Sequence, residues 1–152
     1  MAKNLQIVRF RVSGETYGVS INAVHEVVRL MEITAIPDAP AGVEGVIDLR
    51  GRIIPVVDLR KLFGQREIVS SKKNRILVAE IGGQMFGLVV ESAYEVLRVL
   101  QSEISPAPFA ADNDGGYIVG VIRHRKQLVM LVDFQQLFRA HRFQPIRPLA
   151  EA

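Results

Sequence analysis

The chain has 152 residues, of which 49% are hydrophobic and 23% charged, so its composition is that of a folded domain rather than a disordered segment. Nineteen Lys and Arg against sixteen Asp and Glu leave a net charge of only +3. A protein with a strongly basic surface for nucleic acid would be expected to have a larger positive charge. The absence of cysteine excludes disulfides, thiolate metal sites and cysteine nucleophiles.

The first half of the chain predicts short strands followed by a short helix. We expect strands over 6–12, 15–19, 26–36, 43–49 and 52–57, and a single helical turn over 20–24. Ser13-Gly14 and Arg50-Gly51 are typical of tight hairpin turns between such strands. Asp58 is placed to cap a helix over 59–63, which Gly64 ends.

The second half predicts the same plan. After a polar connector over 65–73, we expect strands over 75–81, 84–90, 94–100, 117–122 and 127–132. A closing helix is expected from Asp133 to about His141. The proline- and glycine-containing segment 105–116 is expected to be a loop.

These two halves are copies of each other. Segments 14–19 and 26–29 recur as 83–88 and 95–98, so that Gly18 corresponds to Gly87 at an offset of 69 residues (87 − 18). A later block recurs at an offset of 75, the distance from Gly45 to Gly120 (120 − 45). Glycines, charges and apolar positions repeat in register, which indicates an internal duplication.

Five short antiparallel strands leave two exposed edges as a flat sheet, and closure into a barrel removes them. The predicted fold is therefore mainly β, with two pseudo-symmetric five-stranded SH3-like β-barrels and short helices. We expect residues 1–152 to form one domain, made of subdomain 1 (about 6–64) and subdomain 2 (about 74–141).

Residues for catalysis or metal binding are few. No His lies three or four positions from another His, Asp or Glu in a metal-box pattern, and there is no phosphate-binding loop or nucleophile elbow. Asp58 and Asp133 occupy equivalent positions, but each follows a strand and precedes a helix, which favours capping over catalysis. We predict no catalytic residue, no metal and no cofactor.

Two basic clusters, 72–75 and 123–126, raise the alternative of a small-barrel nucleic-acid-binding protein. Both fall at a connector or a turn, where solvated charge is normal. The chain has no tryptophan, and most of its aromatic residues fall on apolar or repeat-matched positions typical of a core. These observations weigh against nucleic-acid binding, which we keep as the alternative function.

No run approaches the ~18 apolar residues that a membrane span requires, and the N-terminus has no apolar signal core. We therefore expect a cytoplasmic protein.

From Phe10 to about Phe138 the chain resembles the CheW family, the adaptor domain of bacterial chemotaxis-type signalling. The resemblance is strongest in three segments, 17–27, 36–40 and 43–60, the last of which reads Val-Glu-Gly-Val-Ile-Asp-Leu-Arg-Gly-Arg-Ile-Ile-Pro-Val-Val-Asp-Leu-Arg. It implies two SH3-like barrels and a non-enzymatic adaptor. Such an adaptor couples the cytoplasmic tips of methyl-accepting chemoreceptors to the regulatory domain of a CheA-type histidine kinase, and is recruited to membrane-associated receptor arrays.

The resemblance also implies receptor-contacting residues, which in this chain are Val24, Glu26, Gly45 and Arg50. We add Val27, Ile47 and Gly51 as neighbouring candidates. Apolar side chains would contact a receptor helix, and the guanidinium of Arg50 would make a forked contact to a carboxylate or carbonyl. The kinase-binding residues are not located by the resemblance.

Two features depart from the family pattern. Asp48 stands where the family commonly has Asn, which places a negative charge beside Arg50. The second copy has Arg123-His124-Arg125-Lys126 in place of an Arg-Gly turn, so it need not bind the same partner.

Overall fold

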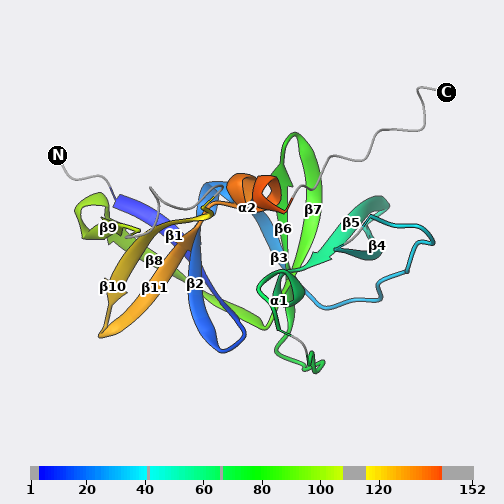
Figure 1. Ribbon diagram of the computed structural model, residues 1–152, viewed down its shortest axis with the longest axis horizontal. Helices are drawn as coiled ribbons and strands as arrows, with labels where there is room; N and C mark the ends of the chain where they lie inside the picture. The colour runs from blue at the N-terminus through cyan, green and yellow to red at the C-terminus, as the bar shows by residue number, and fades with distance from the viewer. Residues whose placement is uncertain (1–3, 41, 66, 108–115, 142–152) are drawn as a thin grey trace.

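The computed structural model describes residues 4–40, 42–65, 67–107 and 116–141, and within these residues the chain forms two β-sheets joined by short helices (Figure 1). Sheet A has the strand order β8 (Ser92–Leu100), β1 (Asn4–Val12), β2 (Glu15–Ser20), β11 (Gln127–Val132), β10 (Ile118–His124) and β9 (Ile104–Pro106). Sheet B has the order β3 (Val24–Arg29), β6 (Arg75–Ile81), β7 (Gln84–Val90), β5 (Arg52–Asp58) and β4 (Val43–Leu49). The helices are η1 (Ile21–Ala23), α1 (Leu59–Leu62), η2 (Gln101–Glu103) and α2 (Phe134–Ala140). The prediction of a mainly β protein with two sheets and short helices is confirmed.

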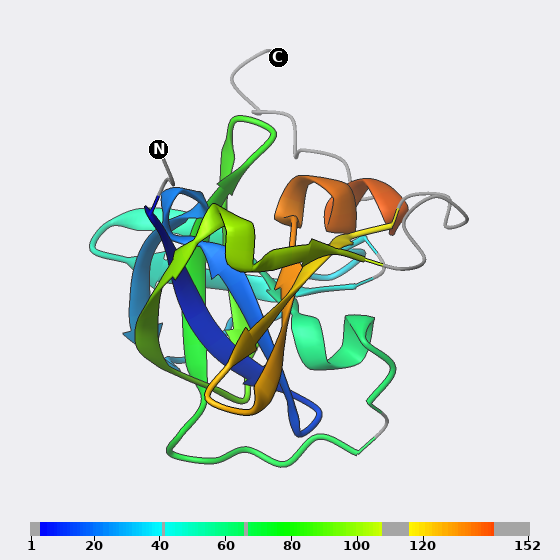
Figure 2. The same cartoon turned by 90° about the vertical axis from the view of Figure 1, so that its left-hand side faces the viewer.

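Each sheet combines strands from both copies of the repeat. The first hairpin of copy one, β1–β2, lies in sheet A among the strands of copy two, and the first hairpin of copy two, β6–β7, lies in sheet B beside β3, β5 and β4 (Figures 1 and 2). The order β8-β1-β2-β11-β10 therefore matches the order β3-β6-β7-β5-β4 position by position. The hairpins expected within each copy form, but the expectation that each sheet is built from the strands of one copy is wrong, because the copies exchange their first hairpins. The ranges 6–64 and 74–141 mark sequence copies that contribute to both sheets, and a single domain over 1–152 stays a prediction.

Neither sheet closes into a barrel among the described residues. In sheet B, one isolated bridge partly closes the sheet: the amides of Thr34 and Val46 each donate to the other's carbonyl oxygen at 2.9 Å. In sheet A, the chain leaves β8 through η2 and returns as β9, which pairs with β10. The bridge and β9 occupy equivalent places in the two sheets.

A single large core lies between the sheets. Val8, Phe10 and Val12 of β1, Leu77 of β6 and Leu137 of α2 are fully or almost fully buried in it, together with side chains from five further elements. Two smaller clusters fill the concave sides, one built on Ile47, Ile54 and Ile76 and one on Ile7, Ile122 and Val129. The alternation along β1 explains this division, because Ile7 and Val8 point to opposite faces.

Two local predictions require correction. The strand expected over 26–36 is β3, Val24–Arg29, because its partner β6 begins at Arg75 opposite Arg29. Beyond Arg29 the segment pairs only through the single bridge from Thr34 to Val46 of β4. Part of the loop expected over 105–116 is the strand β9, and 108–115 lie outside the described residues. The helix caps are confirmed: the side chain of Asp58 accepts from the amide of Arg60, and that of Asp133 accepts from the amide of Gln136.

Candidate partner-binding site

An ion pair joins β3 to the turn between β4 and β5. The guanidinium of Arg50 donates to Oε1 of Glu26, although Glu26 lies on β3 and Arg50 follows β4, the two strands at opposite edges of sheet B. The curvature of the sheet, also seen in the Thr34–Val46 bridge, brings the two edges together. The structure thus places two of the predicted receptor-contacting residues in direct contact.

The turn that carries Arg50 holds its side chain outward. Arg50 and Gly51 have φ angles of +52° and +85°, the left-handed pair that a two-residue hairpin turn requires. Oδ1 of Asp48 accepts a hydrogen bond from the amide of Gly51 at 2.8 Å, so the acidic residue fixes the turn from within. The side chain of Arg50 is 69% exposed and that of Glu26 29% exposed, which leaves the arginine accessible to a partner.

Gly45 has a structural requirement of its own. Its φ is +151°, and a Cβ at this position would lie 2.2 Å from the carbonyl oxygen of Thr34. The glycine therefore permits the close approach that makes the Thr34–Val46 bridge possible. Whatever contact Gly45 makes with a partner, its first role is to bring the two edges of sheet B together.

The other predicted residues occupy different depths. Val27 on β3 is exposed, Val24 is half-buried against the central core, and Ile47 is buried in the cluster inside sheet B. Gly51 lies in the turn beside Arg50. Val27 therefore offers apolar surface directly, whereas Ile47 supports β4 from below.

One apolar side chain near this turn was not predicted as a site residue. Ile53 follows the turn on β5, opposite Asp48, and is 65% exposed. The run 53–57 is apolar throughout, so its sequence has no alternation to show which side chain faces outward.

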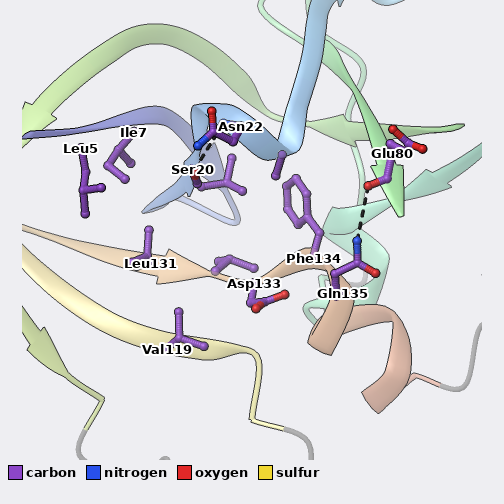
Figure 3. A pocket seen from close by; sticks show the side chains of 13 residues that line it. Leu5, Ile7, Ser20, Asn22, Glu80, Val119, Leu131, Asp133, Phe134 and Gln135 are labelled. Atoms are coloured by element: carbon purple, nitrogen blue, oxygen red, sulfur yellow. Dashed lines mark hydrogen bonds between the residues drawn. The ribbon is translucent and has the colours of Figure 1, made fainter. Parts of the chain in front are cut away.

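A mostly apolar cavity of about 430 Å³ lies beside the start of β3, between sheet A, η1 and α2. Figure 3 shows Leu5, Ile7 and Leu131 on one side of it and Phe134 on the other. Its ends are polar: the amide of Asn22 donates to Oγ of Ser20, and Nε2 of Gln135 donates to the carbonyl oxygen of Glu80 (Figure 3). Ala23 lines the cavity and Val24 follows it directly, so the cavity and β3 share an edge.

Aromatic rings tie the two sheets together next to α1. Phe63, which ends α1, lies 4.9 Å from the ring of Tyr17 and 5.6 Å from that of Tyr117, measured between centroids. Burial raises the pKa of the Tyr17 phenol, with smaller contributions from Tyr117 and Glu15, and burial also raises the pKa of Tyr117. Both phenols therefore stay neutral through the physiological range.

The described residues contain no group of three or more His, Asp or Glu side chains that would hold a metal ion. In the same part of the chain, no helix is long and apolar enough to cross a membrane.

Two pseudo-equivalent sheets around one core, with an exposed charged and apolar surface along β3, define a small β-sheet interaction module. A family model described as a CheW-like domain matches residues 6–142, and the chain belongs to this family. It is 30% identical to the chemotaxis protein CheW of Treponema pallidum (strain Nichols), covering 97% of this chain and 89% of the relative. It is 31% identical to the chemotaxis protein CheW of Rhizobium meliloti (strain 1021), covering 88% and 86%.

The scaffolding protein TtCheW of Thermoanaerobacter tengcongensis, known from a crystal structure, is similar in fold. It superimposes with a TM-score of 0.80 at 38% identity, covering 90% of this chain and 93% of that chain. The family resemblance and the chemotaxis scaffold function are confirmed, and the nucleic-acid alternative is not favoured.

Proposed function

We propose that this protein is a non-enzymatic adaptor that couples the cytoplasmic tips of methyl-accepting chemoreceptors to the regulatory domain of a CheA-type histidine kinase. Membership of the CheW-like family and similarity to a protein described as a scaffold support this role. The adaptor would act in the cytoplasm and be recruited to receptor arrays. The kinase-binding residues are not assigned.

The observation that carries the receptor site is the contact between Arg50 and Glu26. A receptor tip is a helical hairpin, and a helix docks through apolar anchors while charged groups set its register. The guanidinium of Arg50 has five N–H donors, and its hydrogen bond to Glu26 leaves others available. Arg50 can therefore also bind a receptor carboxylate or carbonyl. Glu26 holds the arginine in position for that second contact.

Apolar surface lies beside this pair. Val27 is exposed on the same strand, and Val24 leads to the mostly apolar cavity between sheet A and α2. Gly45 and Gly51 shape the backbone around Arg50, and Ile47 packs beneath β4. We propose this surface as the receptor-binding site, with Ile47 acting through its support of the strand.

We also propose that each sheet represents an SH3-like barrel. In each barrel the segment that follows the third strand of the copy closes the gap, instead of a continuous ladder of strand hydrogen bonds. The Thr34–Val46 bridge in sheet B and the strand β9 in sheet A support this description.

Receptor coupling tests the site directly. Arg50→Ala and Glu26→Ala are each expected to weaken binding to a purified receptor cytoplasmic fragment by about tenfold, since the first removes the charged contact and the second removes the carboxylate that positions it. The same variants are expected to reduce receptor control of autophosphorylation by a CheA-type kinase. Because the pair is exposed, its loss changes the free energy of unfolding by less than about 1 kcal/mol.

Arg125→Ala is the matched control, since Arg125 occupies the position of Arg50 in the second copy and is also exposed. It is expected to leave receptor binding unchanged. Normal kinase coupling by a Glu26→Ala, Arg50→Ala double variant would contradict the assignment of the site.

A further inference from the structure

Positive charges are concentrated where β3 ends and β6 begins. Arg29 and Arg75 are directly opposite each other in the antiparallel pairing of these strands. Like charges in a cross-strand pair are destabilising. Lys72 and Lys73 add two further positive charges in the turn that leads into β6.

Within the described residues, the carboxylate of Glu91 lines a neighbouring pocket with Lys73 and Arg75 but forms its ion pair with Arg11. Arg75 donates from Nη1 to the carbonyl oxygens of Lys72 at 2.9 Å and Asn74 at 2.8 Å, and none of the four basic side chains forms an ion pair there. A hollow of about 650 Å³ lies among Arg29, Lys72 and Arg75, with Leu30 and Ser70 also on its wall and no acidic residue among those that line it. We call this surface the basic hollow.

The turn that carries Lys72 is held in place by hydrogen bonds of the buried side chain of Asn74. Asn74 is buried, and its Oδ1 accepts from the amide of Ser71 at 2.9 Å and from Nη1 of Arg60 at 3.3 Å. Its Nδ2 donates to the carbonyl oxygen of Glu91 at 3.0 Å, which ties the connector to the end of β7. A preorganised turn lowers the entropy cost of binding at the hollow.

We propose that the basic hollow docks an acidic polypeptide segment of a partner protein. Carboxylates match the forked guanidinium groups of Arg29 and Arg75 and would relieve their mutual repulsion. Leu30 supplies an apolar contact that a peptide side chain can cover. Nucleic acid fits less well, because no aromatic side chain lines the hollow for base stacking.

This surface is additional to the proposed receptor site. Its residues are not among those that the CheW resemblance implies, and docking there does not require Arg50 or Glu26.

Peptide titration of the isotope-labelled full chain tests the proposal. At low ionic strength, a capped peptide of eight glutamates is expected to shift the amide resonances of 29–30 and 70–75, while a capped peptide of eight glutamines is not. The double variant Arg29→Ser, Lys72→Ser is expected to weaken binding of the glutamate peptide at least about tenfold. The control Arg125→Ser, Lys126→Ser removes the same charge from the turn of the second copy and is expected to change binding less than about twofold.

Equal weakening by the two double variants, or shifts spread over all basic residues, would overturn the proposal by showing attraction to net charge alone. Tighter binding of a DNA duplex or of inorganic phosphate than of the peptide, at the same residues, would overturn the choice of partner. Thermal unfolding of each variant checks its fold. Lys72→Glu, a single change at an exposed turn, provides a second test and is also expected to weaken binding of the glutamate peptide. Arg50→Ala is expected to bind the peptide like the unmodified chain, so the outcome is independent of the receptor site.

Discussion

The two copies of the repeat use the same glutamate in different ways. Glu26 on β3 and Glu95 on β8 are equivalent, since they are separated by the repeat offset of 69 residues (95 − 26). Glu26 reaches across the open side of sheet B to Arg50, whereas Glu95 pairs with Arg9 on the neighbouring strand, with 3.5 Å between Oε2 and Nη1.

The difference is explained by one position on the neighbouring strand, at which the two copies have different residues. The residue equivalent to Arg9 in sheet B is Val78, which is fully buried opposite Glu26 and offers it no cation. In sheet A, Arg9 satisfies Glu95, and Arg125, the counterpart of Arg50, makes no ion pair with the described residues. The duplication has therefore preserved the backbone and reassigned the charges, so that the two copies present different surfaces to partners.

The largest expected difference in stability between the copies comes from the residue two positions after each helix-capping aspartate. Asp58 and Asp133 both cap a helix, but only Asp58 is followed two residues later by an arginine, Arg60, whose buried guanidinium binds it through Nε–Oδ1 at 3.0 Å and Nη2–Oδ2 at 2.9 Å. Arg60→Ala leaves the buried carboxylate of Asp58 without its cation and is expected to lower the free energy of unfolding by about 3 kcal/mol. Urea denaturation measures this loss.

The matched change in the second copy is Gln135→Ala. Gln135 makes only neutral hydrogen bonds at the surface, to the carbonyl oxygen of Glu80 and the amide of Gly82, so the expected loss is about 1 kcal/mol or less. Equal losses for the two variants would show that the Arg60 network does not distinguish the copies.

The glycines at the start of β4 and β10 give the next largest contrast. In Gly45→Ala the new Cβ would meet the carbonyl oxygen of Thr34 at 2.2 Å, in a backbone conformation with φ of +151°, so we expect a loss of about 2 kcal/mol or more. In Gly120→Ala the new Cβ would meet Cγ2 of Ile104 at 2.7 Å and the carbonyl oxygen of Ser105 at 3.2 Å, without a left-handed φ, so we expect a smaller loss of about 1 kcal/mol. Chemical denaturation of both variants checks the order, and a larger loss at Gly120 would contradict it.

Local features of the fold were predictable from the sequence, and the pairing of the copies was not. Hairpins such as β1–β2 are encoded by alternation and by turn residues such as Ser13-Gly14, which act over a few positions. The exchange of β1–β2 for β6–β7 left no local signal, because duplicated hairpins present similar edges to either copy. The three-residue strand β9 was missed because it is too short for alternation and contains Pro106.

The candidate site was predicted in part for the same reason. Arg50 and Glu26 were singled out by resemblance, but their contact depends on how sheet B curves, which no pattern within β3 or the turn encodes. The burial of Ile47 and the exposure of Ile53 likewise depend on the orientation of whole strands.

The smallest expected effect concerns the two ion pairs themselves, compared by double-mutant cycles. Arg50→Met with Glu26→Gln is expected to give a coupling energy between about 0.2 and 1 kcal/mol, since the side chain of Arg50 is 69% exposed. Arg9→Met with Glu95→Gln is expected to give the larger coupling, about 1 kcal/mol, because the side chain of Arg9 is only 16% exposed and less screened by solvent. Adding salt should reduce the first coupling more than the second. The opposite order would mean that the Arg50 pair contributes more to folding than its exposure implies, and would weaken the view that this arginine is held ready for a partner.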